Sequence, residues 1–207
     1  MDERFKKILT ESAKLFQKCG IRSVSMDDIC REMGISKKTM YQYVESKADL
    51  IAKILEHDHG QHEKAMDYKN RHDNLNAIDI LLEVSKHVCE DMQKFNPSIT
   101  FDLQKFYPEI FKTMLDKKKA YIFEKIKCNI ERGIAEEIYR PDLDVDLVAQ
   151  LYVQRLVDFH NPEFIASGNL SFEKVFRVMF ENHIRGISNA KGVEYFEKQK
   201  QFLNDNI

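Results

Sequence analysis

One short stretch of the chain collects side chains that suit contacts with phosphates and base edges. The set is Lys37, Lys38, Thr39, Tyr41, Gln42, Tyr43 and Lys47. Ammonium groups attract phosphate, and tyrosine hydroxyls donate hydrogen bonds to it from rigid arms. Thr39 and Gln42 offer short polar groups that can reach the donors and acceptors of a major groove. The chemistry that this pattern favours is non-covalent recognition of a nucleic acid duplex.

The residues around this set predict the helices that would position it. Ser25, with Asp28 three residues later, is typical of a helix N-cap with a carboxylate in the first turn. Gly34 ends that helix, and Ser36 caps a second one that we expect to run from Lys37 to Val44. At about 12 Å, two turns of helix match the width of a major groove. The pattern therefore predicts a helix-turn-helix whose second helix is free to read DNA.

Residues 8–54 resemble the N-terminal DNA-binding domain of the TetR family of one-component transcriptional regulators. The matching positions are Ala13, Leu15, Phe16, Gly20, Ile29, Gly34, Ile35, Ser36, Thr39, Tyr41, Tyr43, Lys47 and Leu50. The resemblance implies that Lys37, Lys38, Thr39 and Gln42 face bases or nearby phosphates. It also implies that Ser25, Tyr41, Tyr43 and Lys47 lie at the DNA backbone, and Ser36 is a further candidate DNA-binding residue. Two departures are Lys38, where the family often has a small residue, and Val44, where it often has Phe.

Composition and charge agree with a globular regulator. The 207 residues are 43% hydrophobic and 32% charged, and no apolar run approaches the roughly 20 residues of a membrane span. The charged first residues are unlike a signal peptide, so we expect a cytoplasmic protein with no membrane partner. Residues 1–56 hold 11 Lys and Arg against 9 Asp and Glu. DNA affinity must therefore come from a local basic cluster and from dimerisation. The four cysteines are far apart and are expected to be reduced packing residues.

The remaining periodic patterns all predict helices, so the expected fold class is all-α. We expect a three-helix helix-turn-helix domain over residues 1–56, which includes the start of a connecting helix. A helical effector-binding and dimerisation domain of about six helices should fill residues 57–207. The connecting helix turns polar at residues 56–60, where Gly60 predicts fraying. Further helices are expected near residues 78–92, 101–106, 109–133, 144–160 and 172–187, with a charged one after Gly192.

Three histidines near the predicted domain boundary raise the question of a metal site. His57, His59 and His62 lie within six residues of one another, and His59 and His62 could share a helix face. A solvated linker face explains the same composition, and we favour it. The sequence thus predicts no bound metal.

Aromatic residues in the second domain suggest a pocket for a small, partly apolar effector. The candidate ligand-binding residues are Phe101, Phe111, Tyr121, Tyr152, Arg155 and Phe159. Arg155 falls on an apolar stripe with Leu151 and Tyr152, and a guanidinium that faces inward must be paired. Its partner would be either an internal carboxylate such as Asp158 or an acidic group of the effector.

Two apolar stripes, on residues 144–160 and 171–188, are candidates for a homodimer interface, because paired helices there would form a four-helix bundle. The alternative is that both bury the core of one subunit; for the second we favour the interface, mostly from the family resemblance. The expected function is a regulator, most simply a repressor, that a small molecule releases from a palindromic operator. An enzyme lacks support, since no phosphate-binding loop or catalytic motif is present, and no cofactor is expected. A helical adaptor would leave the lysines and tyrosines of residues 36–47 unused.

Overall fold

The computed structural model describes residues 2–65, 74–93, 96–158 and 171–205. These residues form ten helices and no β-strand, which confirms the all-α prediction for the described part of the chain. The only strand-like contact among them is a single bridge between Tyr139 and Ser188. The helices divide between two compact units, and each unit has its own apolar core.

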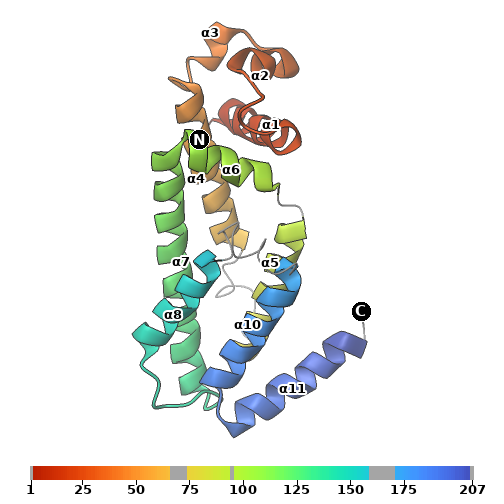
Figure 1. Cartoon of the computed structure of the whole chain (residues 1–207), viewed down its shortest axis with the longest axis vertical. Coiled ribbons are helices and arrows are strands. Elements are labelled where there is room, and N and C mark those ends of the chain that lie inside the picture. Colours follow the sequence, from red (N-terminus) through yellow and green to blue (C-terminus); the bar gives the residue numbers. More distant parts are fainter. Residues whose placement is uncertain (1, 66–73, 94–95, 159–170, 206–207) are drawn as a thin grey trace. The chain divides into compact units, whose positions relative to one another are not determined.

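Unit 1 comprises Met1–Asp67 and Phe95–Lys118. It contains α1 (Glu3–Cys19), α2 (Met26–Met33), α3 (Lys37–Met40), α4 (Lys47–Ala65), α6 (Pro97–Phe106) and the first part of α7 (Pro108–Ala135). Helix α1 packs on both α2 and α4, and α3 projects from α2 (Figure 1). The core of this unit includes Phe16, Ile29, Met40 and Leu50, at most 4% exposed. Burying these side chains packs α1, α2 and α3, which together form the head, on the first turns of α4.

Unit 2 comprises Tyr68–Lys94 and Lys119–Ile207. It contains α5 (Ala77–Gln93), the rest of α7, α8 (Val145–Asp158), α10 (Phe172–Ile187) and α11 (Ala190–Asp205). Helix α10 packs on α5 and α11, as Figure 1 shows. Its core includes Ile78, Ile130, Phe180 and Ile184, none more than 6% exposed. The predicted division after residue 56 concerns function and stays a prediction. Unit 1 contains all of residues 1–56 and adds the rest of α4, α6 and the start of α7.

Two helices include a glycine at which the sequence predicted an end or a beginning. Helix α4 continues through Gly60 to Ala65, so the predicted fraying at Gly60 was wrong. Helix α11 begins at Ala190, before Gly192, because the side chain of Asn189 accepts a hydrogen bond from the Gly192 amide at 3.0 Å. Gly192 is needed there for space: a Cβ on it would lie 2.1 Å from the carbonyl oxygen of Ile138.

Candidate nucleic-acid interface

The two helices of the predicted helix-turn-helix begin at side-chain caps, as their sequence indicated. The Ser25 hydroxyl accepts a hydrogen bond from the Asp28 amide at 3.1 Å, and Asp28 in turn accepts one from the Ser25 amide at 2.9 Å. The Ser25 hydroxyl also donates to the Asp28 carboxylate at 2.6 Å. This bond and the one from the Ser25 amide stabilise the charged form, and so keep the pKa of the Asp28 carboxyl below its usual value. Gly34 adopts the left-handed conformation at φ 63° and ends α2. Ser36 caps α3 by accepting from the Thr39 amide at 3.0 Å.

Helix α3 is shorter than predicted. It covers Lys37–Met40, and a turn over residues 41–43 replaces the expected second helical turn. The amides of Gln42 and Tyr43 bond to carbonyls three residues earlier, those of Thr39 and Met40, at 3.3 and 3.0 Å. Such bonds tighten the backbone beyond the α-helical spacing. Met40 and Val44 still face the core as expected, with exposures of 0% and 2%.

The predicted contact residues on and after α3 differ in how free they are. Lys38, Tyr41 and Gln42 are exposed, and Tyr41 is a large aromatic side chain at 50% exposure. The Lys37 ammonium forms an ion pair at 2.7 Å with Asp27 of α2. The hydroxyls of Thr39 and Ser36 lie 2.9 Å apart and share a hydrogen bond. Lys38, Tyr41 and Gln42 are thus the most accessible donors of this segment.

Tyr43 and Lys47 are held by groups that lie far from them in the sequence. The Tyr43 hydroxyl donates to a carboxylate oxygen of Asp2 at 2.8 Å, and its ring stacks on Phe5 at a centroid distance of 5.2 Å. The Lys47 ammonium donates to the Ile21 carbonyl at 2.5 Å, and partial burial lowers its pKa. An ammonium has three protons, so this bond leaves Lys47 further donors. Lys47 therefore also fixes the loop that leads from α1 to α2.

A second support of that loop comes from α6. Asp102 is only 7% exposed and accepts a hydrogen bond from the Arg22 amide at 2.8 Å. Next to it, Leu103 is buried in the core of the head, and the Asn96 side chain donates to the Gln17 carbonyl at 2.8 Å. This role of α6 was not predicted from the sequence. A carboxylate inside an otherwise apolar helical pattern was the signal that could have revealed it, because a buried charge requires a partner.

Comparison with known proteins indicates which kind of domain this geometry forms. Residues 8–54 match the family model described as bacterial regulatory proteins, tetR family. Residues 8–54 therefore form a TetR-family DNA-binding domain. A Bacillus subtilis relative named uncharacterized HTH-type transcriptional regulator YvaF is 21% identical over 163 residues, which cover 77% of this chain and 82% of that protein. The HTH-type regulator SAR2658 of Staphylococcus aureus is 27% identical over 128 residues, covering 56% and 69%. These are names of transcriptional regulators, not of enzymes.

Solved structures share the fold of this chain at low sequence identity. A putative regulator from Saccharomonospora viridis, in complex with choline, aligns with a TM-score of 0.70 and 17% identity over 91% of this chain and all of that one. The regulator FadR from Bacillus subtilis, in complex with stearoyl-CoA, aligns with a TM-score of 0.64 and 18% identity, covering 88% and 99%. The similarity shows that the helical domain after the head follows the same fold.

The predicted effector-binding residues that the structure describes are divided between the two units. Phe101 and Phe111 belong to unit 1, where Phe101 is 55% exposed and Phe111 packs against the core of the head. Tyr121 and Tyr152 belong to unit 2, and Tyr152 is 7% exposed in its core. Phe159 lies outside the described residues. Within unit 2 the structure therefore brings only Tyr152 into the core.

The prediction that Arg155 faces inward was wrong. Arg155 is exposed, as is Leu151 four residues earlier, because residues at this spacing share a helix face. The core side of α8 is formed instead by Ala149, Tyr152 and Val153. The argument that a buried guanidinium requires an acidic effector therefore no longer holds.

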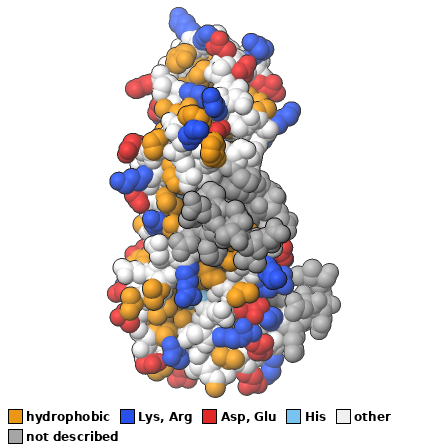
Figure 2. Space-filling view, viewed as in Figure 1, with side chains coloured by type: hydrophobic (Ala, Val, Ile, Leu, Met, Phe, Trp, Pro, Cys, Tyr) orange, Lys and Arg blue, Asp and Glu red, His pale blue; other side chains and the backbone are white. Residues whose placement is uncertain are grey.

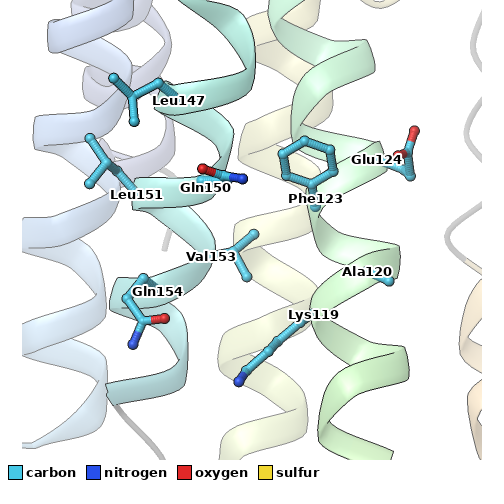
Figure 3. Close-up of a pocket in the computed structure, with 9 residues that line it drawn as sticks. All are labelled: Lys119, Ala120, Phe123, Glu124, Leu147, Gln150, Leu151, Val153 and Gln154. Atoms are coloured by element: carbon cyan, nitrogen blue, oxygen red, sulfur yellow. The ribbon is translucent and has the colours of Figure 1, made fainter.

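A groove of about 520 Å³ lies between α7 and α8 in unit 2 (Figure 3). Phe123 and Lys119 extend from α7 toward α8, and Gln150 and Val153 extend from α8 toward α7. Leu147 and Leu151 point away from Phe123 and are 51% and 56% exposed. The groove combines apolar side chains with one ammonium, one carboxylate and two amides, a lining that suits a partly apolar molecule.

The apolar stripe predicted as an interface on residues 171–188 lies instead in the core of unit 2. Phe176, Met179, Phe180, Ile184 and Ile187 are at most 8% exposed within the single chain. The alternative reading of a monomer core is therefore correct for this stripe. The apolar side chains that remain exposed on these helices are Leu147 and Leu151 of α8 and Val178 of α10.

Two further expectations concern metals and membranes. Among the side chains that the structure describes, no three His, Cys, Asp or Glu come together as a metal site. The side chain of His62, one of the three histidines considered, is outside that set. Within the same part of the chain, no helix combines the length and apolar character needed to cross a bilayer.

Proposed function

We propose that this TetR-family regulator is a repressor that binds a palindromic operator as a homodimer and is released by a small-molecule effector. Binding of DNA by its helix-turn-helix domain is the family's common activity, supported by the match over residues 8–54. The observation that carries the proposal is the capped pair α2 and α3, which leaves Lys38, Tyr41 and Gln42 exposed on one segment. Two such heads on a two-fold axis would enter successive major grooves about 34 Å apart.

The operator experiment is selection of bound duplexes from a random pool, followed by affinity measurements on the selected and on scrambled DNA. Gln42→Ala should lose about 1–3 kcal/mol at particular base pairs and relax the preference there. Tyr41→Phe removes a backbone donor and should weaken all sequences by a similar factor. Equal losses for both variants on every sequence would remove Gln42 from base reading. A protein that enriches no sequence and binds no duplex would refute the proposed function.

We propose that the dimer forms through the exposed faces of α8 and α10. The buried apolar stripes of these helices are not part of the proposed interface. Leu147 and Leu151 lie four residues apart on one face of α8 and, like Val178 of α10, are more than half exposed, so they offer apolar surface to a partner. Leu151→Glu should shift the sedimentation coefficient from that of a dimer to that of a monomer. Leu151→Met, which keeps the apolar face, is the matched control. Dimerisation that survives Leu151→Glu would move the interface elsewhere.

For the effector we propose a chemical class and no single compound. Choline and stearoyl-CoA, bound by the two solved relatives, differ widely in size and charge, so the fold alone fixes no ligand. The groove between α7 and α8 favours a partly apolar molecule with polar groups within reach of Gln150 and Lys119. Such a molecule could release DNA only by binding one conformation of the dimer better than the other. Operator-binding titrations against a metabolite library test this directly.

A further inference from the structure

Two carboxylates of the head occupy donors that the DNA backbone would also need. Asp27 of α2 forms an ion pair with the Lys37 ammonium at 2.7 Å, and Asp2 accepts a hydrogen bond from the Tyr43 hydroxyl at 2.8 Å. Both pairs are at the surface, with the Lys37 and Asp27 side chains 62% and 52% exposed. Figure 2 shows acidic and basic side chains side by side over α2 and α3. The surface that would meet DNA is therefore already partly neutralised.

Asp2 has a second bond of its own, which holds it in place opposite Tyr43. As the N-cap of α1, it accepts a hydrogen bond from the Arg4 amide at 3.2 Å with one carboxylate oxygen. Its other oxygen accepts a hydrogen bond from the Tyr43 hydroxyl. The Phe5 ring, stacked on the Tyr43 ring, keeps that hydroxyl aligned with Asp2. Asp27 is fixed less tightly, as the second residue of α2, whose N-terminal turn is closed by the Ser25 cap.

A carboxylate and a phosphate compete directly for such donors, since both are anions that accept hydrogen bonds through oxygen. The bond to Asp27 raises the pKa of Lys37, and the bond to Asp2 raises the pKa of Tyr43. The same bond lowers the pKa of Asp2, so both partners stay in their bonded forms at neutral pH. A phosphate that approaches either donor must displace a charged oxygen acceptor.

We propose that Asp27 and Asp2 stand in for phosphate in the free protein and thereby set the overall affinity of the head for DNA. This inference rests on the proposed DNA binding and on the sequence prediction that Lys37 and Tyr43 contact DNA phosphates. Backbone contacts are the same on every sequence, so the competition weakens operator and random DNA by the same factor. Sequence preference, which depends on groups such as Gln42, is unaffected. The two carboxylates limit how long the regulator stays on non-operator DNA.

The test replaces each carboxylate by its neutral isostere in the full-length protein. Asp27→Asn and Asp2→Asn should each tighten binding by about two- to fivefold, the range of an exposed ion pair, on operator and scrambled DNA alike. Asparagine also caps helices well, so Asp2→Asn preserves the start of α1. Glu32→Gln on α2 and Glu3→Gln on α1 remove the same charge nearby and serve as matched controls. They report the long-range effect of charge alone.

Double variants decide whether the effect passes through the paired donors. In a Tyr43→Phe background, Asp2→Asn should gain no more than Glu3→Gln does. In a Lys37→Gln background, Asp27→Asn should likewise gain no more than Glu32→Gln. The inference is overturned if Asp2→Asn and Asp27→Asn tighten binding no more than their control variants do. It is also overturned if their full gain in affinity persists when the paired donor is removed. Both outcomes leave DNA binding itself intact. A wild-type protein that binds no duplex would overturn the proposed function and this inference together.

Discussion

The helix ends of the helix-turn-helix and the core of unit 2 are held by contacts of different range along the chain. In the head, the caps at Ser25, Ser36 and Ser46 each accept a backbone amide three residues later. In unit 2, the buried Asn129 side chain donates to the Ala77 carbonyl, 52 residues away, at 2.8 Å. The Tyr195 hydroxyl donates to Asp79, 116 residues away, at 2.8 Å. A short segment thus specifies the shape of the reading helices, while the shape of unit 2 depends on the whole domain.

This difference explains why a function could be inferred more easily for the helix-turn-helix than for unit 2. Local caps and turns leave a signature in adjacent residues of the sequence. Contacts between distant residues leave none in a single sequence. The three predictions below test the contrast, from the largest expected effect to the smallest.

The largest effect is expected where α7 meets Tyr139 in unit 2. A Cβ on Gly133 would lie 2.0 Å from a ring carbon of Tyr139, a side chain that is 1% exposed. The Tyr139 hydroxyl also donates to Asn129 at 3.2 Å, so the ring cannot move without breaking that bond. Gly133→Ala should therefore lower the free energy of unfolding by about 2–4 kcal/mol, measured by chemical denaturation.

Gly186 provides the matched control for this substitution. It lies in α10, is exposed, and has no atom within 4 Å of the position that a Cβ would take. Gly186→Ala should change stability by no more than about 1 kcal/mol, in the stabilising direction expected for a helix. Similar losses for both variants would show that unit 2 tolerates no change in backbone freedom and that packing against Tyr139 is not the cause.

The second prediction concerns a histidine in the same unit. Burial, and then the charge of nearby Arg155, lower the pKa of His183 from 6.5 to about 4, and its ring lies 4.2 Å from that of Tyr152. Between these pKa values the unfolded chain binds the proton and the folded chain does not. Stability should therefore fall as the pH drops below about 6.5, by about 1–1.5 kcal/mol at pH 5.5.

Thermal unfolding at pH 7.5 and 5.5 checks this dependence. His183→Leu should lose that part of the pH effect, because nothing titrates at the position. Tyr152→Phe, which keeps the neighbouring ring and the histidine, should retain it. An unchanged pH profile in His183→Leu would mean that other groups cause the acid destabilisation.

The range of contacts also explains which features could be predicted from the sequence. The cap at Ser25, the turn at Gly34 and the cap at Ser36 were predicted because each depends on residues within one helical turn. The partners of Tyr43 and Lys47 were not, since Asp2 and Ile21 lie 41 and 26 residues away. The periodicity of residues 172–187 correctly predicted a helix with an apolar face. It could not tell whether that face meets its own domain or a second subunit, because both bury the same stripe.

The smallest effect tests the claim that α3 is specified locally. Ser36→Ala removes the oxygen that accepts the Thr39 amide, and it should cost about 1 kcal/mol, the usual value of an N-cap. The loss should appear as faster hydrogen exchange of the Thr39 amide, while amides of the distant Asn129 and Ile130 in unit 2 stay protected. Ser36→Asn supplies another capping oxygen and should restore most of the protection. Thr39→Val, which removes only the second hydroxyl at 2.9 Å, should have a smaller effect than Ser36→Ala. If Ser36→Ala left the Thr39 amide as protected as before, the packing of Met40 in the core would be holding α3. The contrast between a locally specified head and a globally specified unit 2 would then be wrong.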